Sequence, residues 1–210
     1  MNGPATTREE FWGILRSPSD TLSLVIKAHH SIEAKLNEAL EERLPRADKI
    51  ELHRVGFLLK VDFLISLGVL TPQMRHLFEL VNTVRNRFAH DPYASFTEDD
   101  ATKVKNAVRS IDKNYPCSGD AGAILVLLLH VVFDYSTRRF EQIVIERLRS
   151  QALEEMMTDR SWQEPDTSGI ELPPITEEML KEVREEMEPE IVRRVAKKLS
   201  EQHPTIRFKP

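Results

Sequence analysis

Apolar residues recur at three- and four-residue steps along most of the chain, which is the spacing of amphipathic α-helices. The first such helix begins after Ser19 or Asp20, either of which can cap it, and ends at Pro45. Its apolar positions are Leu22, Val25, Ile32, Leu36, Leu40 and Leu44. The next segment is apolar on almost every face over 55–67, as expected of a helix surrounded by other helices, and Gly68 can end it.

Three more helices follow. One begins at Thr71 and Pro72 and ends near His90, because the Asp-Pro pair after it disfavours helical backbone. The apolar stripe of this helix consists of Leu77, Leu80, Val81, Val84 and Phe88. Another starts near Thr97, where a capping hydroxyl precedes three carboxylates in the first turn. A long helix over about 119–157 completes the set, so the segment before the tail contains about five predicted helices.

These elements predict an all-α protein built on a bundle of about five core helices. The predicted parts are an N-terminal anchor segment (1–18), the bundle (19–158), a proline-containing linker (159–175) and a charged amphipathic helical tail (176–210). Phe11 and Trp12 are expected to anchor the first segment on the bundle, and Pro189 is expected to kink or split the tail helix. The apolar stripe of the tail can dock on its own domain, on a second protomer or in the groove of a partner protein.

Charge is distributed unevenly along the chain. Of the 29 basic and 34 acidic residues, 20 of each lie in 1–150, so the net charge of −5 comes from 151–210. A uniformly basic surface of the kind that binds nucleic acid is therefore not expected, and RNA or DNA would have to contact a local patch. Cys117 is the only cysteine, which excludes an internal disulfide, and without a basic neighbour in sequence its thiol is expected to be inert.

Membrane and cofactor motifs are not found in the sequence. The apolar run over 121–133 is shorter than the roughly 20 residues of a membrane span, and the first residues lack the pattern of a secretory signal. We therefore expect a soluble cytoplasmic protein without a membrane partner. P-loop, GxGxxG and HExxH patterns are absent as well, so we predict neither a cofactor nor a metal.

Three polar residues gather near the end of the helix that closes at His90. At about 100° per residue, Asn86 and His90 share the face away from the apolar stripe, and Arg85 lies at the border of that stripe. A guanidinium binds phosphate through two parallel hydrogen bonds, and an imidazole can move a proton near neutral pH. Cleavage of RNA at the ribose 2′-hydroxyl needs a base, a cation for the phosphate charge and a polar group that orients them. The same spacing also arises by chance in charge-rich helices, where such residues only decorate a helix end.

The segment RNRFAHD (85–91) resembles the arginine-polar-histidine signature of the HEPN superfamily, whose all-α members include metal-independent endoribonucleases of toxin and defence systems. The longer stretch 60–104 also resembles the mannitol-operon repressor family. That second likeness is carried by 85–91, by Leu67-Gly68-Val69 and by Phe96-Thr97-Glu98-Asp99. Together the resemblances cover roughly 20–150 and none of the tail.

The HEPN resemblance implies that Arg85 stabilises the phosphate, Asn86 orients its neighbours and His90 acts as acid or base. It also implies a homodimer in which two motifs meet. The leading function is therefore metal-independent cleavage of RNA by transesterification, which leaves a 2′,3′-cyclic phosphate. The repressor resemblance implies another class, a non-catalytic transcriptional regulator that acts through protein partners. A third alternative is a subunit of a toxin–antitoxin or defence operon, with an inactive motif and a tail that binds an antitoxin or regulatory protein.

Arg87 and Tyr93 are weaker candidates for substrate binding. Arg87 lies within the motif, and the signature neither requires nor forbids a cation there. Tyr93 and Phe96 follow the motif and either stack on an RNA base or pin the loop onto the helices. Pinning is the favoured alternative.

The remaining histidines form no recognisable metal-binding set in sequence. His130 shares a helix face with Asp134 and is expected to be a core histidine hydrogen-bonded to a neighbouring helix. His29 and His30 are adjacent and point about 100° apart on a helix, which predicts different environments for them.

Overall fold

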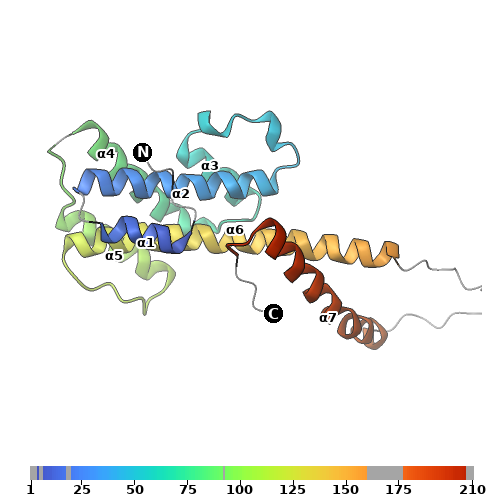
Figure 1. The fold of residues 1–210 in the computed structure, drawn as a ribbon. Helices are drawn as coiled ribbons and strands as arrows, with labels where there is room; N and C mark the ends of the chain where they lie inside the picture. The colour runs from blue at the N-terminus through green and yellow to red at the C-terminus, as the bar shows by residue number, and fades with distance from the viewer. Residues whose placement is uncertain (1–3, 5–6, 18–19, 92, 160–176, 207–210) are drawn as a thin grey trace, which may run out of the picture. The chain divides into compact units, whose positions relative to one another are not determined.

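The computed structural model describes residues 4, 7–17, 20–91, 93–159 and 177–206, and all regular structure within them is helical (Figure 1). The prediction of an all-α protein is therefore confirmed. The chain divides into two compact units, Met1–Ile143 and Val144–Pro210. The boundary falls within the long helix α6 (Ala121–Asp159), which contributes residues to both units.

Helix α1 (Arg8–Arg16) is held on the first unit by an aromatic contact. Thr7 and Glu10 form a capping box at its start, in which each side chain accepts a hydrogen bond from the other residue's backbone N–H. Phe11 is only 1% exposed, and its ring stacks on that of Phe133 in α6 with the centroids 3.8 Å apart. Helix α1 thus contributes Phe11 to the core of the first unit.

Helix α2 (Thr21–Arg43) has the ends that its sequence predicts. The Asp20 carboxylate accepts a hydrogen bond from the backbone N–H of Ser23, and the helix stops before Pro45. The chain then forms η1 (Ala47–Lys49), η2 (Leu52–Arg54) and α3 (Phe57–Ser66). Gly68 follows α3 with φ of +72°, a left-handed conformation that glycine adopts without strain.

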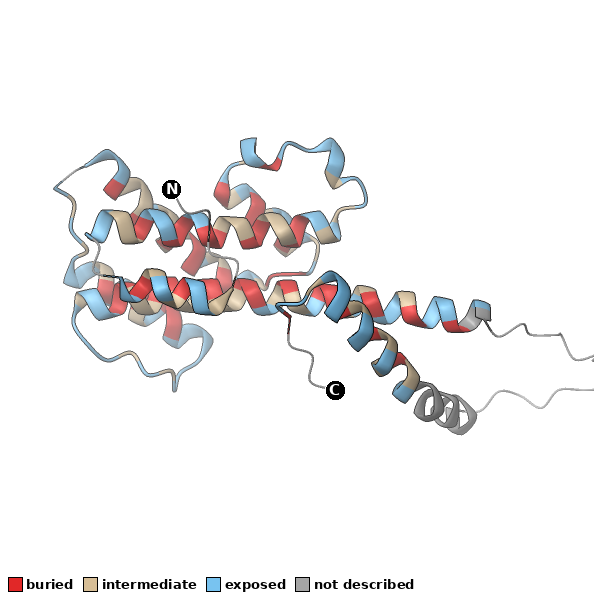
Figure 2. Ribbon diagram, in the orientation of Figure 1, coloured by how far each residue is buried: buried red, intermediate tan, exposed pale blue. Residues whose placement is uncertain are grey.

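Helix α4 (Arg75–His90) follows the single turn η3 (Pro72–Met74), and a loop then leads to α5 (Glu98–Ile111). The predicted apolar stripe of α4 is buried except for Leu80, which is half-buried. Buried and exposed positions alternate along the helices of the first unit (Figure 2). The pairs of helices in closest contact in the first unit include α2 with α4 and α3 with α4. Helix α4 therefore packs through its apolar stripe, and His90 at its end is exposed.

The N-terminal cap of α5 supports a first prediction. The Thr97 hydroxyl accepts a hydrogen bond from the backbone N–H of Asp100, and the Asp100 carboxylate accepts one from the backbone N–H of Thr97. Thr97→Ala removes the first of these bonds and is expected to lower the free energy of unfolding by about 1 kcal/mol in urea titrations. Thr102→Ala is the matched control, because the exposed Thr102 hydroxyl only bonds the carbonyl of Glu98 one turn before it. Equal losses in the two variants would contradict the capping role.

Helix α6 supplies the central apolar residues of the first unit. Its fully buried side chains there include Ile124, Leu128, Leu129, Val132 and Phe133. By length and composition alone, one helix in the described part of the chain, Ala121–Met156, is long and apolar enough to cross a membrane. Core helices of soluble proteins pass the same test, and 44% of this window is buried within the structure. The finding is compatible with the expected soluble protein.

The second unit pairs the end of α6 with α7 (Glu177–Gln202). Lys198 of α7 forms an ion pair with Glu155 of α6, and Arg149 of α6 forms one with Glu188 of α7 at 2.6 Å. The buried apolar residues of α7 are Ile191, Val195 and Leu199. The sequence allows the tail to dock on its own domain, on a second protomer or in the groove of a partner protein. In the structure, α7 packs on α6 of its own chain.

Two expectations for the region around α7 have different outcomes. The helix continues through Pro189, so the predicted split does not occur. The predicted linker (159–175) lies outside the described residues except for Asp159.

Candidate functional site

The predicted site residues lie where α4 ends. The helix stops because Asp91 adopts extended backbone (φ −127°, ψ 107°), as is favoured for a residue before proline. The backbone N–H of Asp91 still donates to the carbonyl of Arg87 at 2.9 Å, which completes the last turn. Arg87 and His90 occupy this turn, where the partial negative charge of the helix end favours cations. The backbone therefore favours positive charge at the candidate site.

Arg85 is half-buried, and its charge is not neutralised by a carboxylate. Its Nη1 donates a hydrogen bond to the side-chain oxygen of Asn86 at 3.0 Å. Among the residues that the structure describes, no acidic side chain forms an ion pair with Arg85. Because the amide of Asn86 is neutral, it orients the guanidinium and leaves its positive charge available to an anion.

Arg87 is bound in a different way from Arg85. Its Nη1 and Nη2 donate to the two carboxylate oxygens of Asp100 in α5, at 3.3 Å and 2.6 Å. Burial alone would raise the pKa of Asp100, but hydrogen bonds from Arg87 and Thr97 outweigh it and lower that pKa to about 2. The guanidinium expected to be a weak substrate-binding group is thus engaged in joining α4 to α5.

The other two predicted residues are open to solvent. His90 is exposed one turn beyond Asn86. Tyr93 is 92% exposed, and only its backbone is fixed, by a 2.9 Å hydrogen bond from its N–H to the Asp91 carboxylate. The favoured expectation that Tyr93 pins its loop to the helices is therefore wrong, whereas Phe96 is half-buried.

A histidine outside the predicted site lies close to Arg85. His29 of α2 is 6% exposed, and its ring centroid lies 4.4 Å from that of Phe57. Its Nε2 has no hydrogen-bond partner in the described part of the chain. Burial lowers the pKa of His29 to about 4; Glu33 and Asn82 oppose this shift, and the positive charge of Arg85 adds to it. The imidazole beside Arg85 is therefore neutral at physiological pH.

The sequence does contain a signal for the burial of His29. It lies four residues after Val25 and three before Ile32, both members of the predicted apolar stripe. The neighbouring His30 falls outside that stripe and is exposed. The predicted difference between the two histidines is confirmed.

His29 predicts how stability depends on pH. As the pH falls from 6.5 to 4, the unfolded chain protonates this histidine before the folded chain does, so stability decreases through that window and is highest above it. The loss amounts to at most about 3 kcal/mol, at roughly 1.4 kcal/mol per pKa unit. His29→Leu is expected to remove this contribution, as measured by urea unfolding at a series of pH values.

His30→Gln is the matched control for this experiment, because His30 is the exposed neighbour on the same helix. It should keep the pH dependence of the wild type. If His29→Leu still lost as much stability as the wild type between pH 6.5 and 4, the burial of a neutral imidazole would not be the source of that loss.

The remaining candidates do not add to the site. No group of three or more His, Cys, Asp or Glu side chains that could hold a metal occurs among the described residues. His130 is half-buried against Trp12, with the ring centroids 4.4 Å apart, and this ring contact takes the place of the expected hydrogen bond to another helix in the described structure. Burial lowers the pKa of His130. Cys117 is a free, partly exposed thiol.

The end of α4 thus presents two complementary groups. Arg85, held by Asn86, is a cation without a carboxylate partner in the described structure, and His90 is a solvent-accessible imidazole on the next turn. Such a pair can bind a phosphodiester and transfer a proton. Comparisons of the chain with protein-family models, with curated proteins and with solved structures found no match.

Proposed function

We propose that the chain is a metal-independent endoribonuclease of the HEPN type, which acts as a homodimer at the end of α4. The observation that carries this proposal is the state of Arg85. Two arginines occur two residues apart, and Asp100 pairs with Arg87 while only a neutral amide holds Arg85. A guanidinium that has no carboxylate partner among the described residues, one turn from an exposed imidazole, suits the binding of a phosphodiester that is to be cleaved.

In the proposed reaction, His90 accepts the proton of a ribose 2′-hydroxyl, and the resulting oxygen attacks the adjacent phosphorus. Arg85 donates hydrogen bonds to the non-bridging oxygens as negative charge develops on them. The bond from phosphorus to the 5′-oxygen then breaks, which yields a 2′,3′-cyclic phosphate and a 5′-hydroxyl. The partner subunit's His90 supplies the proton to the 5′-oxygen, which is why the proposal requires two copies of the motif.

Tyr93 has a place in the same proposal. Its ring is 92% exposed two residues after Asp91, where it offers a flat surface to an unstacked base. Stacking on Tyr93 would bind single-stranded RNA without strong sequence preference, because every base has a face that can stack.

The test is incubation of the purified protein with mixed RNAs in the presence of EDTA. Cleavage by the wild type that is lost in both Arg85→Ala and His90→Ala supports the proposal. Arg109→Ala is the matched control, since it removes an equal charge from an exposed position on α5. Loss of activity in this variant as well would point to general electrostatic attraction and not to the motif.

A second candidate function is that of a non-catalytic regulator that binds a protein partner. It is favoured by Leu59 and Phe63, which lie one turn apart on α3 and are 49% and 40% exposed. The equal numbers of basic and acidic residues in 1–150 also suit a protein partner. Absence of cleavage of any RNA by folded protein would favour this function over the nuclease.

A further inference from the structure

A pocket of about 320 Å³ lies in the first unit between the start of α4, the end of α5 and the middle of α6. This volume is in the range of sites for small ligands. Its floor is apolar and consists of Met74, Leu77, Val108, Ile111 and Val131. The candidate nuclease residues lie at the opposite end of α4 and are not among the residues that line this pocket.

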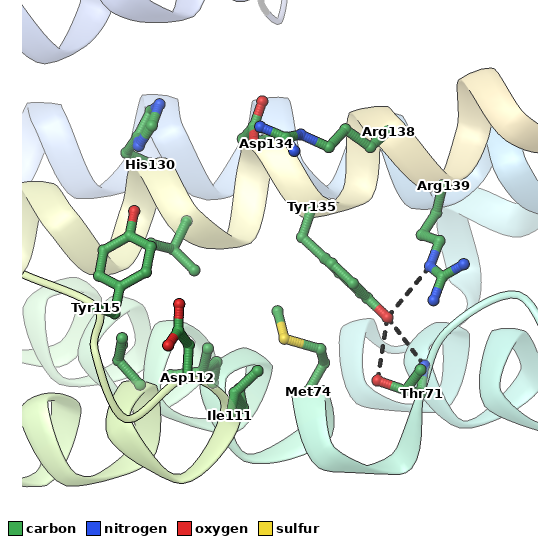
Figure 3. Close-up of a pocket in the computed structure, with 13 residues that line it drawn as sticks. Thr71, Met74, Ile111, Asp112, Tyr115, His130, Asp134, Tyr135, Arg138 and Arg139 are labelled. Carbon is green, nitrogen blue, oxygen red and sulfur yellow. Dashed lines mark hydrogen bonds and ion pairs between the residues drawn. The ribbon is translucent and has the colours of Figure 1, made fainter.

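A set of polar groups forms one end of the pocket (Figure 3). The Tyr135 hydroxyl accepts a hydrogen bond from the backbone N–H of Thr71 at 3.1 Å and shares another with the Thr71 hydroxyl. The Arg139 Nε donates to the same Tyr135 oxygen at 3.3 Å, and the guanidinium lies 5.3 Å from the centre of the tyrosine ring. The Nη1 of Arg139 donates to the side chain of Gln142 at 2.9 Å. Arg139 is thus oriented entirely by neutral groups.

The adjacent Arg138, unlike Arg139, is paired with a carboxylate. Its Nε lies 2.7 Å from a carboxylate oxygen of Asp134, whose other oxygen lies 2.9 Å from Arg8 of α1. Figure 3 shows Arg138 turned toward Asp134 and Arg139 turned toward Tyr135. In the described part of the chain, Arg139 has no carboxylate partner, so its charge is the one available to a ligand of this pocket.

Asp112 lies toward the other end of the pocket, beside Tyr115 (Figure 3). One of its carboxylate oxygens accepts a hydrogen bond from the backbone N–H of Asn114 at 2.9 Å. A second negative group on a ligand would be repelled there. The charges of the pocket therefore favour an anionic group at the Arg139 end only.

We propose that this pocket binds a small monocarboxylate with an apolar body. The carboxylate pairs with the guanidinium of Arg139, which is already oriented by Tyr135 and Gln142, and the apolar body covers the floor formed by Met74 and Ile111. The preformed orientation of Arg139 reduces the conformational entropy lost on binding. This site is independent of the proposed nuclease activity.

The test is calorimetric titration of the full chain with three compounds that share one apolar body: 4-phenylbutyrate, 4-phenylbutanol and 4-phenylbutylamine. The carboxylate is expected to bind at least about tenfold more tightly than the alcohol or the amine, as one charge-assisted hydrogen-bonded pair provides. Arg139→Gln is expected to abolish this preference, and Arg138→Gln is expected to leave it within about threefold. Ile111→Trp enlarges a side chain that lines the pocket and should weaken the binding of all three compounds.

Several results would overturn the proposal. The first is equal or tighter binding of the amine, and the second is a preference that is lost in Arg138→Gln and kept in Arg139→Gln. The third is no binding of any compound at about 10 mM, a concentration at which a ligand with a Kd of about 1 mM occupies most of the protein. Thermal unfolding of each variant checks that it is folded. RNA cleavage is measured separately, so failure of the pocket proposal and failure of the nuclease proposal are distinguishable.

Discussion

Glu33→Ala is expected to lower the free energy of unfolding by about 3–5 kcal/mol, because it leaves the ammonium group of Lys60 buried without its partner. Lys60 of α3 is fully buried, and its Nζ lies 2.6 Å from a carboxylate oxygen of Glu33 in α2. An isolated charge in such a place is desolvated without compensation, which destabilises the fold. Urea unfolding at neutral pH measures the loss.

Two variants make this experiment specific. Lys60→Met removes the buried charge with a similar volume and is expected to be close to neutral, alone or combined with Glu33→Ala. Glu41→Ala removes an exposed acidic residue from the same helix and should change stability by about 0.5 kcal/mol or less. A loss in Glu33→Ala no larger than that in Glu41→Ala would show that the ion pair is not needed to stabilise the buried Lys60.

Arg85→Ala is expected to slow RNA cleavage by about 100- to 1000-fold, the usual effect of removing one donor that stabilises a developing negative charge. The rate constant of Arg85→Lys should lie between those of the wild type and Arg85→Ala, because lysine keeps the positive charge but lacks the two parallel hydrogen-bond donors of arginine. Single-turnover rate constants with excess protein and EDTA separate this effect from changes in RNA binding.

Chemical rescue distinguishes a direct role from a structural one. Millimolar guanidinium ion is expected to restore part of the activity of Arg85→Ala and to leave that of His90→Ala unchanged, since only the former lacks a guanidinium. The thermal unfolding temperature of Arg85→Ala should stay near that of the wild type, because Arg85 is only half-buried and, among the described residues, hydrogen-bonds only to Asn86. A rate constant for Arg85→Ala equal to the wild-type value would remove Arg85 from the mechanism.

The ends of the helices could be predicted from sequence because they depend on neighbouring residues. The carboxylate of Asp20 begins α2, the Asp91-Pro92 pair ends α4, and the Thr97 hydroxyl begins α5, each through contacts within a few residues. The apolar face of α4 could be predicted for the same reason, since helical period alone places those residues together. Local signals therefore predicted the all-α class and the position of the candidate motif on a helix end.

Contacts between helices could not be predicted in this way. The burial of Lys60 depends on Glu33, which lies 27 residues earlier on another helix. Arg87 is separated from Asp100 by 13 residues and a loop, so nothing in the motif indicates that one of its two arginines has a carboxylate partner. The exposure of Tyr93 likewise depends on the path of that loop, because an aromatic residue in sequence is as compatible with packing as with solvent.

Attack of the ribose 2′-hydroxyl is the defining step of the proposed nuclease, and a comparison of two substrates tests for it. Unmodified RNAs and fully 2′-O-methylated RNAs of the same sequences are incubated with the wild-type chain in EDTA, and the ends of any products are identified by mass spectrometry. We expect the unmodified RNAs to be cut to 2′,3′-cyclic phosphate and 5′-hydroxyl ends, and the methylated RNAs to stay intact. Cleavage through the 2′-hydroxyl would be contradicted by any of three results: cleavage of the methylated RNAs, products with 5′-phosphate ends, or no cleavage of the unmodified RNAs by folded protein.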